Sequence, residues 1–203
     1  MLFRSSLSSF NQKHKFTGNW IAELPFGENH RYLQRGALSH ILNAWSLSGD
    51  FTIASGLWYT PNVLGNSVDI DRGVTGSVRA DVTGQPIAIG NPSAREWFNT
   101  AAFCSPSSSA GTTNTCLNPN GTTFGDAGRN IIEGPGEVVV DMSLSKTITV
   151  KESRALELRL QAANVFNFIN YMAINTTVNS LQFGQVTSAG ATRRVTLVAR
   201  FRF

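Results

Sequence analysis

The stretch RRVTLVARFRF, residues 193–203, alternates apolar and polar side chains up to the last residue of the chain. In an extended strand, every second side chain from Val195 to Phe203 would lie on one apolar face, while Arg194, Arg200 and Arg202 would lie on the other. Soluble chains usually end in polar, frayed residues. The segment therefore predicts a strand at about 191–203 whose apolar face meets an environment other than water.

The same two-residue period recurs along the chain and predicts four more strands, at about 14–24, 44–58, 137–150 and 154–165. The last of these is rich in helix-forming residues, but its apolar residues at every second position outweigh helix propensity. The connections are unequal. A tight turn at 151–153 contrasts with the segments 25–43 and 166–190 and with a very long connection at about 59–136.

Two architectures fit such strands, a soluble β-sandwich and a transmembrane β-barrel. The barrel explains more, because each strand is long enough to cross a bilayer at a tilt and the polar faces carry charges of both signs, as a wet interior would. If the last strand ends on the periplasmic side, both long connections fall outside and the shortest turn falls inside. We therefore expect residues 1–203 to be an all-β segment of five or so antiparallel strands, a partial transmembrane barrel with one very long external loop.

Composition and charge exclude several other classes of protein. Charged residues make up 15% of the chain, and no apolar run approaches the ~18 residues that a membrane helix needs. The net charge is +4, but the basic residues are dispersed and no zinc-ligand spacing occurs, which argues against nucleic-acid binding. No catalytic, cofactor-binding or metal-binding constellation stands out, so the sequence predicts no enzyme.

Five segments, in chain order, resemble the C-terminal part of TonB-dependent outer-membrane receptors of the Oar-like subgroup. One resembles the "WFNPAAF" loop motif and another the "GN.GRN…GPG…D.SL.K" element of that family, and the final aromatic is similar to the residue by which the barrel assembly machinery recognises its substrates. The segments are KHKFTGNWIAELPFG (13–27), LNAWSLSGDFTIASGLWYTP (42–61), REWFNTAAF (95–103), FGDAGRNIIEGPGEVVVDMSLSKTI (124–148) and LRLQAANVFNFIN (158–170).

The resemblance implies a function in uptake of a scarce ligand across the outer membrane of a Gram-negative bacterium. The implied partners are outer-membrane lipid, the rest of the receptor barrel with its plug, TonB through an N-terminal part missing here, and the barrel assembly machinery. Such receptors have about 22 strands around a plug, so the chain is expected to be a fragment that is not active alone. The alternative is a secreted soluble β-sandwich that binds carbohydrate or mediates adhesion.

The remaining expectations concern individual residues. Phe203 and Phe201 are expected to form the assembly signal, and Cys104 and Cys116, 12 residues apart in a loop-like stretch, a disulfide. Two sets of aromatic residues complete the expectations: an interfacial girdle of Trp20, Trp45, Trp58 and Tyr59, and ligand contacts by Trp97, Phe98 and Phe103, unless those three fold the loop onto itself.

Overall fold

The computed structural model describes residues 6–26, 31–32, 35–64, 77–105, 125–151 and 154–203. It divides into two compact units. The strand unit comprises Lys15–Ala54, Glu137–Asn170 and Ala191–Phe203, and the loop unit comprises Met1–His14, Ser55–Gly136 and Tyr171–Gly190. No helix of the described residues is long and apolar enough to cross a membrane.

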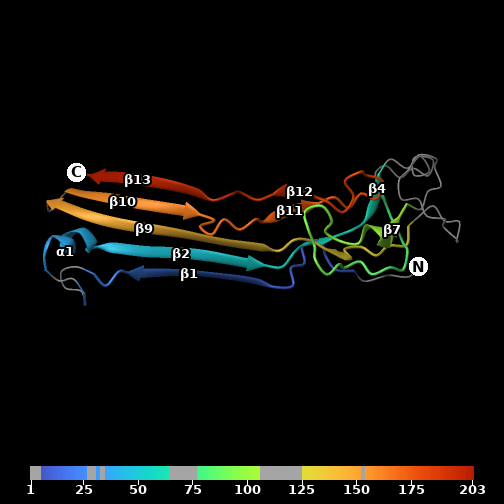
Figure 1. Ribbon diagram of the computed structural model, residues 1–203, viewed down its shortest axis with the longest axis horizontal. Helices are drawn as coiled ribbons and strands as arrows, with labels where there is room; N and C mark the ends of the chain where they lie inside the picture. Colours follow the sequence, from blue (N-terminus) through green and yellow to red (C-terminus); the bar gives the residue numbers. More distant parts are fainter. Residues whose placement is uncertain (1–5, 27–30, 33–34, 65–76, 106–124, 152–153) are drawn as a thin grey trace. The chain divides into compact units, whose positions relative to one another are not determined.

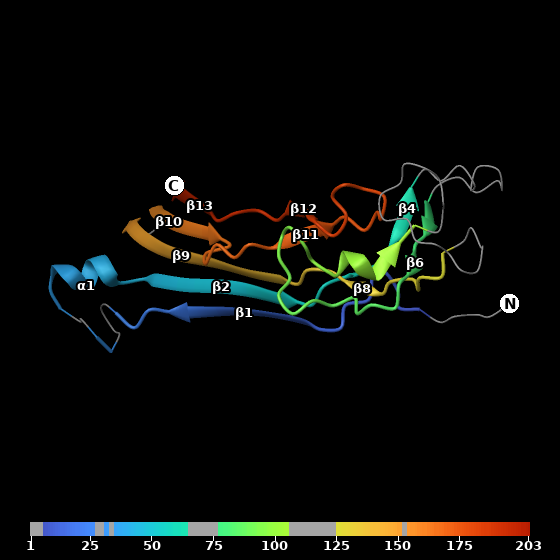
Figure 2. The same cartoon turned by 45° about the vertical axis from the view of Figure 1, so that its right-hand side comes forward.

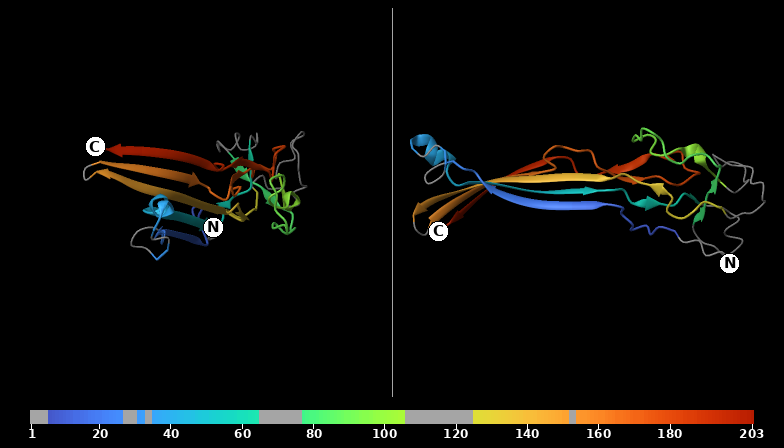
Figure 3. Two further views of the ribbon diagram at one scale, coloured as in Figure 1. Left: turned by 60° about the vertical axis from the view of Figure 1, so that its left-hand side comes forward. Right: turned by 90° about the horizontal axis from the view of Figure 1, so that it is seen from below.

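The strand unit is a five-stranded sheet in which neighbours in the sheet follow one another along the chain (Figure 1). All four pairings are antiparallel, and the strands twist along their length (Figure 3). This confirms the predicted all-β, antiparallel and partial-barrel architecture. The strands are β1 (Lys15–Glu23), β2 (Trp45–Ala54), β9 (Glu137–Lys151), β10 (Arg154–Ala163) and β13 (Arg194–Arg202).

One face of this sheet is apolar across all five strands. The register places Ala22, Leu47, Leu144, Leu160 and Leu197 in a single row. Because side chains alternate between faces, the neighbouring rows of the same face, up to the register shift beside Arg154, are apolar too, apart from the charged Lys146. This apolar face, as we call it below, consists of Phe16, Gly18, Trp20, Ala22, Trp45, Leu47, Gly49, Phe51, Ile53, Val138, Val140, Met142, Leu144, Lys146, Ile148, Leu156, Leu158, Leu160, Ala162, Val195, Leu197, Ala199 and Phe201.

Two glycines on the apolar face are covered by aromatic side chains of the paired strand. Gly18 faces Phe51, and Gly49 faces Trp20. A Cβ on Gly18 would lie 2.6 Å from the Phe51 ring, and one on Gly49 would lie 3.0 Å from the Trp20 indole. The two aromatic rings thus cover the positions on β1 and β2 where a side chain is missing, and they fill the gaps that the glycines leave in the sheet.

The direction of each strand determines at which end of the sheet the connection that follows it begins. The segments from β2 to β9 and from β10 to β13 both leave at the end that carries Ala54, Glu137, Ala163 and Arg194. The turn from β9 to β10 and the C-terminus lie at the other end, with the β1–β2 connection and its short helix α1 (Ala37–Leu42; Figure 2). The two long connections and the short turn therefore lie at opposite ends of the sheet, as predicted.

The loop unit has a hydrophobic core of its own, although the sequence suggested little more than a long loop at about 59–136. The rings of Phe98, Phe103 and Phe183 pack edge to face, with centroids 5.2–6.3 Å apart. Val63, Ala80, Ala102, Ile132, Ile174 and Val178 complete this core. Its elements are β3 (Trp58–Tyr59), β4 (Asn62–Leu64), β5 (Ser77–Arg79), β6 (Asp81–Val82), η1 (Thr100–Ala102), β7 (Phe103–Cys104), β8 (Ile132–Glu133), β11 (Tyr171–Ile174) and β12 (Val186–Ala189).

The main difference from the predicted strands lies at the end of the second one. The alternation continues to about residue 58, but β2 ends at Ala54 and Trp58 belongs to β3 in the loop unit. Gly56 explains the break, because a Cβ there would lie 1.9 Å from the carbonyl oxygen of Gly134. Only a glycine allows the two backbones to approach this closely.

Candidate functional site

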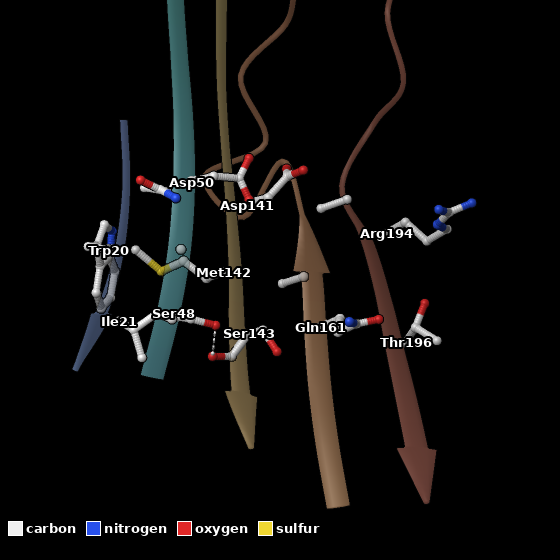
Figure 4. A pocket seen from close by; sticks show the side chains of 14 residues that line it. Trp20, Ile21, Ser48, Asp50, Asp141, Met142, Ser143, Gln161, Arg194 and Thr196 are labelled. Carbon is white, nitrogen blue, oxygen red and sulfur yellow. Dashed lines mark hydrogen bonds between the residues drawn. The ribbon is translucent and has the colours of Figure 1, made fainter. Parts of the chain in front are cut away.

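The face of the sheet opposite the apolar face is polar and bears an open groove of about 520 Å³. Serines of adjacent strands face each other there: Ser46 and Ser145 share a hydrogen bond of 2.7 Å between hydroxyls, and the Ser48 hydroxyl donates to the Ser143 carbonyl. Figure 4 shows the groove from close by, with Asp50, Asp141, Gln161, Arg194 and Thr196 projecting from four strands. We call this surface the polar face.

Charge on the polar face is segregated by strand. The register places Lys15 and four carboxylates on β1, β2 and β9, whereas β10 and β13 carry four arginines and one glutamate. Within the basic part, Arg159 forms an ion pair of 2.6 Å with Glu157. We expect a face with so many charged side chains to be in contact with water. The carboxylates are Glu23, Asp50, Glu137 and Asp141, and the arginines are Arg159, Arg194, Arg200 and Arg202.

Asn164 directly follows β10 and holds the chain where it leaves the sheet. It has a positive φ of 48°, a backbone conformation that asparagine tolerates better than most residues. Its backbone N–H donates to Asp141 Oδ1 at 2.7 Å, and its side chain both donates to the carbonyl and accepts from the N–H of Phe168. Asp141 is therefore partly used in shaping this end of the sheet.

A second concave site lies wholly within the loop unit. This cavity, of about 490 Å³, is lined mainly by apolar side chains of segments far apart in the sequence. Trp58 and Trp97 contribute indoles, and the Trp97 N–H donates to the Glu133 carbonyl at 3.1 Å. The other side chains in its lining are Ser55, Ile87, Ala88, Ile89, Pro92, Phe98, Ile131, Ile132 and Glu133. We call it the indole cavity.

The polar side chains of the indole cavity are held by the segment before β1. Lys13 Nζ lies 2.9 Å from Glu133 Oε2 and 4.6 Å from the centre of the Trp58 ring. The Ser55 hydroxyl accepts from the backbone N–H of His14 at 3.1 Å. No short-range sequence motif predicts these contacts, since Lys13 and Glu133 lie 120 residues apart.

The predicted ligand-contact residues lie in the core of the loop unit and around its cavity. Phe98 and Phe103 are each 2% exposed in the hydrophobic core, where the WFNTAAF segment packs against the rest of the loop unit, and Phe98 also lines the indole cavity. Asn99 supports this packing by accepting from the N–H of Ala101 and donating to the carbonyl of Pro86. The contact of Phe98 and Phe103 with a ligand stays a prediction. Trp97 lines the indole cavity, and its contact with a ligand stays a prediction.

The predicted girdle residues divide between the two units. Trp20 and Trp45 lie on the apolar face, where the Trp45 N–H donates to the Ile41 carbonyl. Trp58 and Tyr59 form β3 of the loop unit, and the girdle stays a prediction. The Tyr59 hydroxyl donates to the carbonyl of Met172.

The expectations for the C-terminal aromatics and the cysteines stay predictions. Phe201 and Phe203 stack with ring centroids 6.4 Å apart, and Phe203 is 95% exposed. Cys104 is buried in β7, whereas Cys116 lies outside the described residues.

Comparison with known proteins identifies the family of the chain. Residues 2–196 match the model of the outer membrane beta barrel domain. The chain belongs to this family. No curated protein and no solved structure matches it. The apolar face of this outer-membrane barrel domain is accordingly the lipid-facing surface, and the polar face is the inner one, as the alternation in transmembrane barrels requires.

The loop unit of the barrel domain contains a carboxyl group with a perturbed pKa. Asp81 in β6 is 8% exposed. Burial raises the pKa of this carboxyl above its usual 3.8, the N–H of Asp126 partly opposes the rise, and the Asp126 carboxylate adds to it. The Asp126 N–H donates to Asp81 Oδ1, and Asp126 Oδ1 accepts from the N–H of Val82, both at 2.9 Å.

We expect the free energy of unfolding of the loop unit to fall as pH rises from about 3.8 through the raised pKa of Asp81. Over this window the folded state binds the proton more tightly than the unfolded state, so deprotonation opposes folding. Thermal unfolding of the wild type and of Asp81→Asn at a series of pH values measures the effect. The variant should show a flatter dependence, and parallel curves would contradict the assignment.

Gly56→Ala should destabilise the loop unit by about 1–3 kcal/mol, the usual cost of forcing atoms into a packed site. The added methyl would meet the Gly134 backbone, which cannot rotate away as a side chain could. Gly90→Ala is the matched control, because nothing lies within 4 Å of a Cβ there. Urea unfolding followed by tryptophan fluorescence would distinguish them, and equal midpoints would refute the close approach of residues 56 and 134.

Proposed function

We propose that this outer-membrane barrel domain is the C-terminal part of a TonB-dependent receptor of the Oar-like subgroup, which takes up a scarce ligand without covalent chemistry. The observation that carries the proposal is that the long connections between the strands form a compact unit of their own. Two long connections emerge from the same end of the sheet and contribute to one compact loop unit with its own core and cavity. Binding sites commonly lie on such loops above a rigid scaffold.

The open sheet supports the view that further strands complete the barrel. Within the described part of the chain, β1 and β13 are the two edges of the five-stranded sheet. Transmembrane barrels need at least about eight strands, and an open edge leaves backbone groups without partners in lipid. The proposed partners are therefore the remaining barrel strands and the plug, with TonB engaged through a preceding part and the assembly machinery through Phe203.

The polar face supports the same proposal. Its charged rows would line a wet or plugged interior, where the acidic strands β1, β2 and β9 and the basic strands β10 and β13 would contact a plug of mixed charge. The family match favours this arrangement over the alternative of a secreted soluble β-sandwich, in which the apolar face would be buried by a second sheet.

The test is the reading frame upstream of Met1, followed by uptake. An in-frame continuation that encodes a plug, a TonB-binding segment and more alternating strands is expected. Deleting tonB should then abolish growth that depends on the intact receptor, whereas a frame that encodes none of these parts would overturn the proposal. A further control is a receptor whose TonB-binding segment is deleted, which should still reach the outer membrane but lose uptake.

A further inference from the structure

We infer that the indole cavity binds a flat, predominantly apolar organic molecule. This inference rests on the proposed receptor function for its role in uptake, because it names the class of ligand that the loop unit would hold. Binding itself is a property of the loop unit and can be measured without TonB.

The size and lining of the cavity set the class of ligand. Its volume of about 490 Å³ falls within the ~300–1,000 Å³ typical of small-molecule sites. The side chains of Trp58, Trp97, Ile87, Ile89 and Ile131 present aromatic and branched apolar surface. Such a lining favours flat or compact apolar groups, which gain by leaving water.

The polar groups of the lining argue against a sugar. A sugar would need several donors and acceptors, but the carboxylate of Glu133 is paired with Lys13 and the hydroxyl of Ser55 accepts from His14. The amide nitrogen of Gly134 is also used, since it donates to the carbonyl of Leu57 at 2.8 Å. Few polar side chains therefore remain for the many hydroxyl groups of a sugar, and each hydroxyl group left without a partner would cost free energy.

One polar atom of the cavity residues does not face the space inside the cavity. Trp58 Nε1 is buried, out of reach of solvent, and has no hydrogen-bond partner among the described residues. An oxygen atom of a bound molecule would be about the size of a water oxygen and would not reach this N–H either. Trp58 therefore contributes apolar ring surface to the lining, and Lys13 lies 4.6 Å from the centre of its ring.

Binding of 2-naphthoate, a two-ring apolar anion with acceptor oxygens, tests the inference. The full chain in lipid nanodiscs is compared with empty nanodiscs by equilibrium dialysis, which subtracts partition of the probe into lipid. We expect saturable binding by the wild type. Ala88 is an exposed residue of the lining, and Ala88→Trp would place an indole in the space that the probe occupies. We therefore expect this variant to bind the probe at least about tenfold more weakly.

A second variant makes the result specific. Ala101→Trp places the same bulk on an exposed residue outside the cavity and should leave binding unchanged. Binding no greater than to empty nanodiscs, or equal binding by the wild type and Ala88→Trp, would overturn the inference. Neither result bears on the receptor proposal, which the upstream frame and the tonB deletion decide separately.

Discussion

Leu197→Arg should destabilise the folded chain in lipid by about 2–4 kcal/mol, the cost of an arginine near the middle of the lipid-facing surface of a barrel. Leu197 is 73% exposed on the apolar face, and its row runs through Leu160, Leu144 and Leu47 across the sheet. An arginine at this position would have to carry its charge into hydrocarbon or draw water toward it, and either response costs free energy.

Thr196→Arg is the matched control for this substitution. It introduces the same side chain one residue earlier in β13, but on the polar face, where Thr196 pairs with Gln161. Urea titration of the intact barrel that contains the chain, folded in lipid vesicles and followed by tryptophan fluorescence, measures both variants. We expect a large fall in the free energy of unfolding for Leu197→Arg and a small change for Thr196→Arg. A larger effect for Thr196→Arg would mean that the two faces are assigned the wrong way round, and equal effects would contradict the assignment of one face to lipid.

The sheet was predictable from sequence because strand alternation is a local signal. Side chains at every second position reveal both faces of a strand without knowledge of its partners. The segment that became β10 shows how strong the signal is, since its leucines and its glutamate favour a helix by propensity, yet residues Arg154–Ala163 form a strand. Antiparallel pairing of chain neighbours then follows from the short turn and the parity of the connections.

The loop unit could not be predicted in the same way, because its contacts join residues far apart in the chain. Phe183 packs on Phe98 and Phe103 although the two long strands β9 and β10 lie between them in the sequence. The indole cavity combines Trp58, Trp97 and Ile131, and its rim depends on Lys13. The strands of the loop unit have only two to four residues each. They are too short for an alternation of apolar and polar residues to be recognised. The aromatic residues of the WFNTAAF motif signalled an important segment, but not which of its rings would be buried.

Phe103→Ala should cost the loop unit about 3–5 kcal/mol of folding free energy, as expected for removal of a large buried aromatic side chain. Phe103 is 2% exposed, and its ring contacts those of Phe98 and Phe183. Truncation leaves a cavity in the middle of this cluster and removes two edge-to-face contacts. The loss is a large share of the stability of a small domain, so the variant should be largely unfolded in this unit at moderate temperature.

Limited proteolysis and thermal unfolding would measure this loss, with Leu181→Ala as the control. Leu181 belongs to the same unit but is 90% exposed, so its truncation removes little packing and should leave protease resistance unchanged. Rapid cleavage within 55–136 in Phe103→Ala alone would show that these residues fold around the phenylalanine cluster. Comparable resistance of Phe103→Ala and the wild type would instead mean that the loops owe their order to other contacts.

The indole cavity, whose lining includes Phe98, would then not depend on that core, and 2-naphthoate binding should survive in the variant. If the cluster does order the unit, binding of the probe should be lost together with protease resistance.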